Sequence, residues 1–145
     1  MNAVEIEEAV SELALKAFDA EEFPFSFLEA FGNKSTTIKK LRSGASNKTD
    51  VENAILQRNN IHILSSENGK VTESLEALRN SSTTKKSKAE FILATDGLDF
   101  QAENILTGET VVCEYKDFHN YFGFFLSLAN ITTVKQIRES AFDIK

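Results

Sequence analysis

The sequence has one cysteine, one proline, no tryptophan and no long hydrophobic run. Because Cys113 has no partner cysteine, the chain cannot carry an internal disulfide framework, and a reducing compartment suits it. No apolar run approaches the roughly 18 residues that a membrane-spanning helix requires. The first ten residues, MNAVEIEEAV, are acidic rather than basic, which argues against a secretory signal peptide. These absences predict a cytoplasmic protein with no membrane partner.

The chain has 145 residues, of which 41% are hydrophobic and 26% are charged. This composition is ordinary for a globular protein, so we expect residues 1–145 to form a single domain with its own core. The last four residues, FDIK, place apolar side chains at the very end, without a polar tail. We therefore expect the domain to be a fragment of a longer protein.

The net charge of −6 is distributed over three segments of alternating sign. Residues 1–33 contain eight acidic side chains and one basic side chain, and residues 89–145 contain nine acidic and four basic side chains. Between them, residues 34–88 contain eleven basic and five acidic side chains, a net charge of +6. This basic segment is a candidate phosphate-facing patch inside an otherwise acidic protein.

Hydrophobic periodicity predicts both helices and strands. Apolar residues that recur every three or four positions predict helices over 2–19, 24–31, 35–43, 71–78 and 118–126, and from 132 onward. Shorter apolar runs between turn residues predict strands over 54–57, 61–64, 91–94, 100–102 and 111–113. Residues 81–88, SSTTKKSK, are polar and are expected to form a mobile surface connection. The expected fold class is α+β, with a mixed, largely antiparallel sheet flanked by helices.

The expected core lies within residues 91–128, where a buried strand and a hairpin precede an aromatic helix. Asp117 stands where this helix needs an N-cap. A two-residue turn at Thr107 and Gly108 is expected to close the hairpin, since Gly108 can adopt positive φ. The asparagine pair at 59–60 also tolerates a type I′ turn between two strands, although one continuous bent strand is an alternative.

Two acids and a lysine near the hairpin form one candidate metal site. Glu114-Tyr115-Lys116 has the Glu-x-Lys spacing of nucleases that hold Mg²⁺ with acids on neighbouring strands and orient water with a lysine. The expected turn places Asp99 opposite Lys116 and on the same face as Glu114. The same pattern fits a hairpin with one solvated face, on which Asp99 and Lys116 are an ordinary cross-strand charge pair. The sequence favours the solvated face.

No other pattern indicates catalysis or metal binding. His62 and His119 stand alone, without ligand spacing to Cys113, so we expect no metal site at these residues. The sequence contains no Gly-x-Ser-x-Gly motif and no phosphate-binding glycine loop. Nothing in it resembles a methyl-donor site, so we expect no cofactor in this domain.

Cations in the basic segment give the strongest binding signal. The candidate DNA-binding residues are Lys34, Lys39, Lys40, Arg42, Lys48 and Arg58. Neutral donors such as Ser35, Thr36 and Asn47 lie among them, as in surfaces that contact phosphate groups. The alternative is that these residues are simply the solvated face of a helix and a loop. The two alternatives differ in salt dependence, because binding to DNA phosphates weakens steeply as salt rises.

Several stretches of core and turn residues, covering most of the chain, match one known pattern. They are 27–32 (FLEAFG), 36–44 (TTIKKLRSG), 56–63 (LQRNNIHI), 91–97 (FILATDG) and 134–139 (VKQIRE). Together they resemble the start of large bacterial DNA methyltransferases, the MmeI-like group of type IIG/IIL restriction-modification enzymes. The resemblance implies a nuclease-like N-terminal domain, followed in the parent chain by a helical spacer, an S-adenosylmethionine-dependent adenine methylase and a target-recognition domain.

The resemblance also identifies where a nuclease site would lie. Cleaving members of the family carry an acid and then Glu-x-Lys on the next strand, before the strand that resembles residues 91–95. The matching positions here are Asp50, Gln57 and Asn59. Because Gln57 replaces a metal-binding carboxylate and Asn59 replaces the lysine, the resemblance implies a restriction-nuclease-like fold with a degenerate active site. Glu114-Tyr115-Lys116 follows the expected strand and does not occupy these positions.

The resemblance therefore implies the N-terminal domain of a bacterial DNA (adenine-N6) methyltransferase, one that does not cleave DNA. We expect it to contact the DNA backbone or to pack against the remaining domains of the parent methyltransferase, which would bind S-adenosylmethionine. One alternative is an active Mg²⁺-dependent DNA endonuclease domain. A second is a structural interaction module that binds no nucleic acid.

Overall fold

The computed structural model describes residues 2–129, and the helix predicted from residue 132 lies outside them. In chain order, the described elements are α1 (Ala3–Leu15), α2 (Phe23–Ala30), α3 (Ser35–Ser43), β1 (Ala54–Gln57), β2 (Ile61–Ser65), α4 (Val71–Asn80), α5 (Ser82–Lys86), β3 (Phe91–Thr95), β4 (Asp99–Asn104), β5 (Thr110–Glu114) and the 3₁₀ helix η1 (Tyr115–Ala129). Among the described helices, none is both long enough and apolar enough to cross a membrane.

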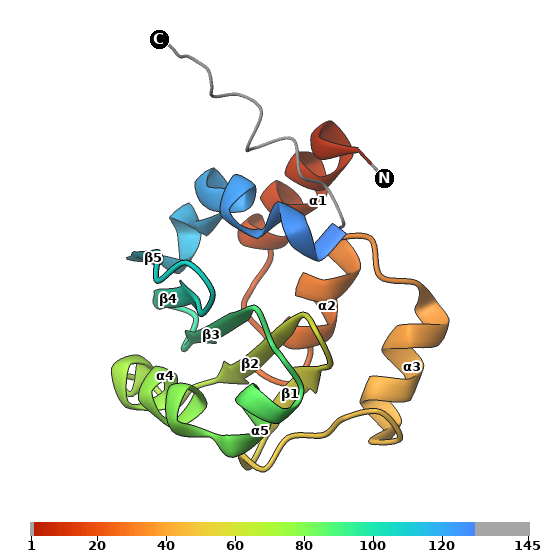
Figure 1. Cartoon of the computed structure of the whole chain (residues 1–145). Coiled ribbons are helices and arrows are strands. Elements are labelled where there is room, and N and C mark those ends of the chain that lie inside the picture. The colour runs from red at the N-terminus through yellow and green to blue at the C-terminus, as the bar shows by residue number, and fades with distance from the viewer. Residues whose placement is uncertain (1, 130–145) are drawn as a thin grey trace, which may run out of the picture.

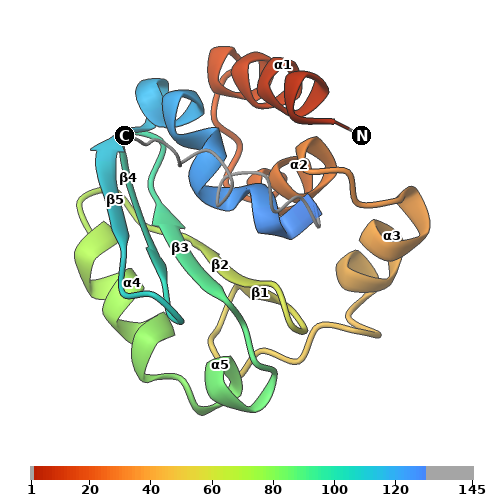
Figure 2. The ribbon, with the colours of Figure 1, turned by 45° about the horizontal axis from the view of Figure 1, so that its top comes forward.

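The five strands form one sheet in the order β1-β2-β3-β4-β5. The chain crosses over through α4 and α5 between β2 and β3, which are parallel, whereas the other neighbouring strands pair antiparallel. Helices α1 and α2 and η1 cover one face of the sheet, and α4 covers the other (Figures 1 and 2). This arrangement confirms the predicted α+β class with a mixed, largely antiparallel sheet. The likeness to restriction nucleases stays a prediction.

Aromatic rings fill the layer between the sheet and the helices α1, α2 and η1. Phe100 of β4 and Phe118 of η1 are stacked, with ring centroids 4.8 Å apart and an interplanar angle of 5°. Phe27 of α2 meets Phe125 of η1 edge-on at 5.2 Å. Such ring pairs add to the stabilisation that comes from burying the rings. A smaller cluster packs α4 against the opposite face of the sheet: Val71, Leu75, Leu78, Ile92 and Ala94.

The N-terminal helix α1 begins with a capping box and carries four of the eight acidic side chains of residues 1–33. The Asn2 side chain accepts a hydrogen bond from the Glu5 backbone N–H, and the Glu5 carboxylate accepts one from the Asn2 N–H, both at 2.9 Å. The helix buries Ile6 and Val10 and ends at Leu15, earlier than predicted. Its exposed acids are Glu5, Glu7, Glu8 and Glu12. These acids place negative charge at the end of the molecule opposite α5 (Figure 1).

The aromatic segment predicted to be an α-helix is instead the 3₁₀ helix η1, with non-helical backbone angles at Tyr121. It begins at Tyr115, so the prediction of Asp117 as its N-cap is wrong. A 3₁₀ helix aligns side chains three positions apart. Tyr115 and Phe118 accordingly lie on the same side, with ring centroids 5.0 Å apart, and both are buried.

The hairpin between β4 and β5 has a longer loop than predicted. The Asn104 side-chain oxygen accepts hydrogen bonds from the N–H groups of Leu106 and Thr107, which shapes a loop over residues 105–109. The two-residue turn is therefore wrong, and Asp99 lies opposite Glu114 rather than Lys116. Because this register differs from the predicted one by two residues, each side chain keeps its predicted face.

The turn between β1 and β2 also differs from the type I′ prediction. Gln57 pairs with Ile61, which leaves a three-residue loop, and Asn59 has a φ of 68°. Asn60 is not among the residues with positive φ, whereas a type I′ turn requires positive φ at both central positions. The two separate strands are present as predicted, so the alternative of one bent strand is wrong.

The polar stretch 81–88 is not an irregular connection. It contains the helix α5, whose N-cap Ser81 accepts a hydrogen bond from the Thr83 N–H. Ser81, Thr84 and Ser87 are buried, with 2–8% of each residue exposed. The predicted mobile connection is therefore wrong, and the lysines of this stretch stand on an ordered element.

Candidate nucleic-acid interface

Helix α3 presents the first group of predicted DNA-binding cations. Ile38 and Leu41 are buried against the rest of the molecule, so the side chains of Lys39, Lys40 and Arg42 point outward, and all three are exposed. Cations in the last turn also suit the negative end of the helix dipole. Gly44, with a φ of 88°, ends the helix and turns the chain toward the loop that carries Lys48.

The turn between β1 and β2 brings Arg58 next to the start of α3. The Gln57 amide donates a hydrogen bond of 2.7 Å to the side-chain oxygen of Asn33, the residue before Lys34. The Gln57 oxygen accepts a hydrogen bond of the same length from the Asn60 side chain. These two bonds fix the turn against the α2–α3 connection, and therefore hold Lys34 and Arg58 on neighbouring segments.

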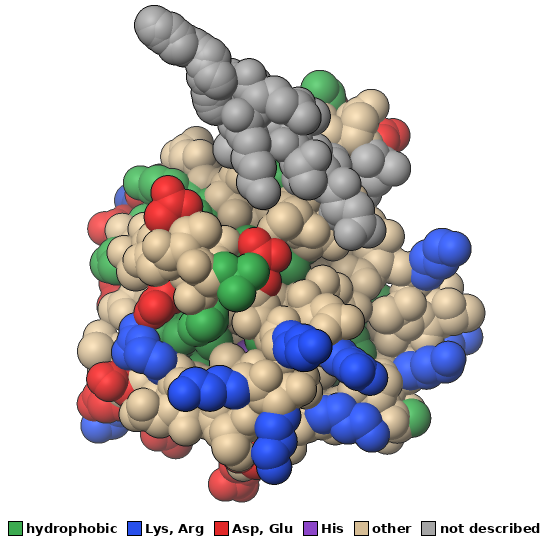
Figure 3. Space-filling model, in the orientation of Figure 1, with side chains coloured by type: hydrophobic (Ala, Val, Ile, Leu, Met, Phe, Trp, Pro, Cys, Tyr) green, Lys and Arg blue, Asp and Glu red, His purple; other side chains and the backbone are tan. Residues whose placement is uncertain are grey.

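Helix α5 and the residues directly after it add three lysines that are not among the predicted DNA-binding residues. The Asn59 N–H donates a hydrogen bond of 2.7 Å to the Ser87 carbonyl, which joins the turn that carries Arg58 to the end of α5. Lys and Arg side chains consequently gather over α3, α5 and this turn (Figure 3). The basic face is defined here as the exposed residues Lys34, Lys39, Lys40, Lys48, Arg58, Lys85, Lys86 and Lys88. The run Lys85-Lys86-Ser87-Lys88 is evident as a basic cluster in the sequence, but the sequence does not show which segments lie beside it in space.

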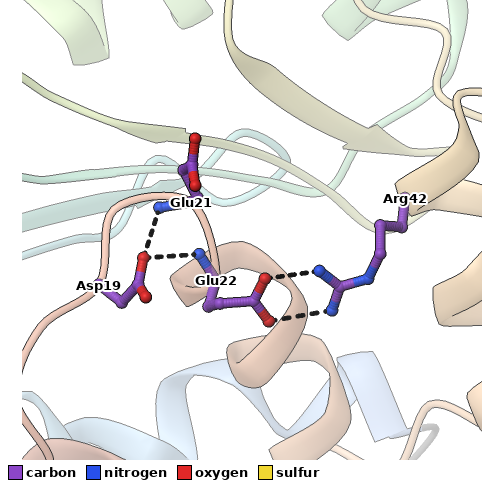
Figure 4. A network of polar contacts seen from close by, with 4 residues as sticks. All are labelled: Asp19, Glu21, Glu22 and Arg42. Atoms are coloured by element: carbon purple, nitrogen blue, oxygen red, sulfur yellow. Dashed lines mark hydrogen bonds and ion pairs between the residues drawn. The ribbon is translucent and has the colours of Figure 1, made fainter.

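Arg42 is not counted in the basic face because its guanidinium is already paired with another side chain. It donates two hydrogen bonds to the Glu22 carboxylate, at 2.5 and 3.0 Å (Figure 4). It also stacks 4.3 Å above the Phe25 ring. The hydrogen bonds from Arg42 hold the pKa of the Glu22 carboxyl below its usual value. Asp19 in turn accepts hydrogen bonds from the Glu21 and Glu22 N–H groups. Arg42 therefore ties α3 to the start of α2.

Among the neutral donors predicted to face phosphate, Asn47 has a structural role. Its side-chain nitrogen donates to the Ala54 carbonyl at 3.1 Å, and its oxygen accepts from the Leu56 N–H at 2.9 Å. Asn47 thus provides hydrogen-bond partners for backbone groups on the outer edge of β1. Ser35 and Thr36, in the first turn of α3, are exposed beside Lys34.

Asp50, the first of the predicted degenerate nuclease positions, anchors the start of α5. Its carboxylate accepts hydrogen bonds from the hydroxyls of Ser81 at 2.5 Å, Thr83 at 2.9 Å and Ser82 at 3.2 Å. The bond from Ser81, followed by that from Thr83, lowers the pKa of Asp50. The carboxylate is therefore ionised at neutral pH and already surrounded by donors.

Gln57 and Asn59, the other two degenerate positions, serve the fold of the β1–β2 turn. Gln57 is buried, with 9% exposed, and both ends of its amide have protein partners. Asn59 is in the left-handed region at the tip of the turn. Within residues 2–129, no group of three or more His, Cys, Asp or Glu side chains is arranged to hold a metal ion.

The comparison with known families decides the relationship. A family model described as "MmeI, N-terminal domain" matches residues 1–145. The chain belongs to the MmeI N-terminal domain family. The predicted resemblance is thereby confirmed, and the chain is related to restriction-modification proteins. Searches of curated proteins and of solved structures returned no match.

In this MmeI N-terminal domain, the two acids and the lysine of the candidate metal site near the hairpin lie close together. Asp99, Glu114 and Lys116 line a shallow surface depression of about 360 Å³, together with Gly97 and Leu98. Lys116 pairs with Glu114 on its own segment at 3.3 Å, not with Asp99 as the predicted register required. Both members of this pair are mostly exposed, as expected of a solvated face.

The isolated histidines and the cysteine of this MmeI N-terminal domain do not form a site either. His62 is fully buried on β2 and bonds two threonines. Burial raises the pKa of the Cys113 thiol to about 11, so the thiolate that a metal or a nucleophilic reaction needs is disfavoured.

Proposed function

We propose that this domain contacts the sugar-phosphate backbone of DNA through its basic face, as part of a restriction-modification DNA (adenine-N6) methyltransferase. The observation that supports the proposal is the convergence of eight exposed cations from α3 and the residue before it, the loop before β1, the β1–β2 turn, and α5 with the residues directly after it. Phosphate contacts of this kind fix the position of a protein on a duplex without reading its sequence. Recognition and methyl transfer with S-adenosylmethionine then belong to the remaining domains of the parent chain.

The proposal predicts a specific dependence on salt. Each neutralised phosphate contributes a slope of about −0.9 in a plot of log affinity against log salt concentration. If about six of the eight cations contact phosphates, affinity falls roughly 10³-fold between 50 and 200 mM salt. A protein of net charge −6 that binds DNA with this slope must use a local patch, because its overall charge repels the duplex.

We further propose that the domain does not cleave DNA. Asp50, Gln57 and Asn59 take part in hydrogen bonds or a turn that build α5 and the β1–β2 loop. A nuclease of this type needs carboxylates free to hold Mg²⁺ and an amine to activate water. Here one acid is surrounded by hydroxyl donors, and the other two positions carry amides.

The experiment that tests both proposals uses the purified 145-residue chain. Fluorescence anisotropy with a short labelled duplex should show binding at low salt and a steep loss as NaCl rises. Failure to bind at low salt would favour the structural interaction module. Incubation with supercoiled plasmid and Mg²⁺ or Mn²⁺ should leave the plasmid intact.

One observation keeps the endonuclease as a second candidate, namely the depression lined by Asp99, Glu114 and Lys116. Nicking that is lost in the Glu114→Gln variant would establish this site as a nuclease centre. Nicking that survives the substitution would instead indicate a contaminating enzyme.

A further inference from the structure

A buried hydrogen-bonded bridge joins the loop before β1 to helix α5 through β2. His62 of β2 is 0% exposed, and its two ring nitrogens contact threonines from two different segments. The Nε2 atom lies 2.6 Å from the Thr49 hydroxyl, and the Nδ1 atom lies 2.8 Å from the Thr84 hydroxyl. Thr49 follows Lys48, and Thr84 precedes Lys85. The His62 bridge, meaning Thr49, His62 and Thr84, therefore connects two cation-bearing segments across the α4 side of the sheet.

The hydroxyl protons of the bridge assign one tautomer to the imidazole. Thr84 donates its only hydroxyl proton to the Leu78 carbonyl at 2.7 Å, so its oxygen can only accept from the ring. Nδ1 must then carry the proton. In a neutral ring Nε2 is consequently the acceptor, and Thr49 donates to it while accepting from the Val51 N–H at 3.0 Å. The opposite tautomer would take the Thr84 proton away from Leu78.

The ring is neutral at ordinary pH. Burial lowers the pKa of His62 to about 4, although the Asp50 carboxylate nearby acts in the opposite direction. A neutral ring with one N–H matches one hydroxyl that accepts and one that donates. The doubly protonated ring would instead present two donors, and the Thr49 hydroxyl proton would be left with the more distant Val51 carbonyl, at 3.3 Å, as its acceptor.

We infer that His62 is a positioning residue for DNA contact, because its Nδ1–H tautomer fixes α5 relative to the loop that carries Lys48. This inference rests on the proposed DNA contact. Asp50 bonds the first turn of α5 through Ser81, Ser82 and Thr83, and the bridge holds the middle of the same helix through Thr84. With the bridge intact, the lysines of α5 and Lys48 have a fixed spacing and can meet neighbouring phosphates together.

The test compares the removal of one buried hydroxyl in the bridge with the same change elsewhere. Thr84→Val removes the acceptor for Nδ1 with little change of shape, and Thr84→Ser restores it. Thr95→Val is the matched control, because Thr95 is buried like Thr84 (0% and 2% exposed) and donates a hydrogen bond of 2.6 Å to the Asp99 carbonyl, on a strand that carries no basic-face residue. For every variant, two quantities are measured: the slope of log affinity for a duplex against log salt concentration (the salt slope), and the free energy of unfolding in urea.

The salt slope of Thr84→Val is expected to fall in magnitude by about 0.9 for each phosphate that the variant no longer neutralises. Thr84→Ser should regain the wild-type slope, and Thr95→Val should keep it even though that variant loses stability. A Thr84→Val variant with the wild-type slope would overturn the inference. ¹⁵N NMR of the imidazole, with His62→Gln to assign the signals, should show the proton on Nδ1, and a proton on Nε2 would also overturn it.

Failure of the proposed DNA contact gives a different result. In that case the wild-type chain binds no duplex, and the slopes cannot be measured for any variant. The His62 bridge is then tested by amide hydrogen exchange. The Ala89 N–H donates a hydrogen bond to the Thr84 carbonyl, and the Ser87 N–H donates one to the Thr83 carbonyl, so both amides report on the order of α5. Faster exchange of these two amides in Thr84→Val, but not in Thr95→Val, would support the bridge. Equal exchange in both variants would refute it.

Discussion

Neutralising the lysines of α5 gives a sharp test of the basic face. The triple variant Lys85→Gln, Lys86→Gln and Lys88→Gln removes three of its eight cations. If each contacts one phosphate, the salt slope should decrease in magnitude by about 2.7. Because this electrostatic contribution vanishes near 1 M salt, affinity at 0.1 M should fall roughly 500-fold. Anisotropy titrations of a labelled duplex at several NaCl concentrations measure both quantities.

The control carries the same change of net charge outside the basic face. Lys16→Gln, Lys70→Gln and Lys116→Gln remove three exposed cations from the end of α1, the start of α4 and the start of η1. This control should retain the wild-type slope. Equal losses in the two triple variants would show that only net charge matters. An unchanged slope in the α5 variant would refute the placement of α5 against DNA.

Three further predictions concern stability and are checked by urea denaturation. The pKa of His62 is about 4 in the folded state and 6.5 ordinarily, so the unfolded chain binds more protons between these two pH values. The free energy of unfolding should therefore fall by up to about 3 kcal/mol as pH drops from 6.5 to 4. The His62→Gln variant should lack this pH dependence. Phe118→Ala empties a site that is 1% exposed and should cost about 3–5 kcal/mol, whereas a cost below about 1 kcal/mol would contradict the ring packing described above. Asn104→Ala leaves the Leu106 and Thr107 N–H groups without their acceptor and removes a donor to the Glu90 carboxylate. It should cost about 1–3 kcal/mol and change the NMR amide signals of the hairpin and of the residues around Glu90.

The order and type of most elements could be predicted because local patterns determine them. The run at 91–94 predicted the fully buried strand β3, and the spacing of Val71, Leu75 and Leu78 predicted α4. The resemblance to the MmeI group likewise depended on these core and turn residues, and the family match confirmed it.

The misses share one cause, which is that a distant or unforeseen partner decides the local structure. The polar stretch 81–88 becomes a helix because Asp50 and His62, far away in sequence, bond its hydroxyls. The hairpin register depends on where one asparagine side chain places its oxygen. The charge count placed the lysines of 85–88 in the basic segment 34–88, but their position beside Arg58 depends on the bond between Asn59 and Ser87, which the sequence does not show.

Helix α1 and helix α5 lie at opposite ends of the molecule (Figure 2), the first with four exposed carboxylates and the second with three exposed lysines in or beside it. The domain is consequently an electric dipole as well as a net anion. In the field of a polyanion such a body experiences a torque before it makes any contact, which turns α5 forward and α1 away. Encounter would thus select one approach direction and leave the acidic end pointing outward from the duplex.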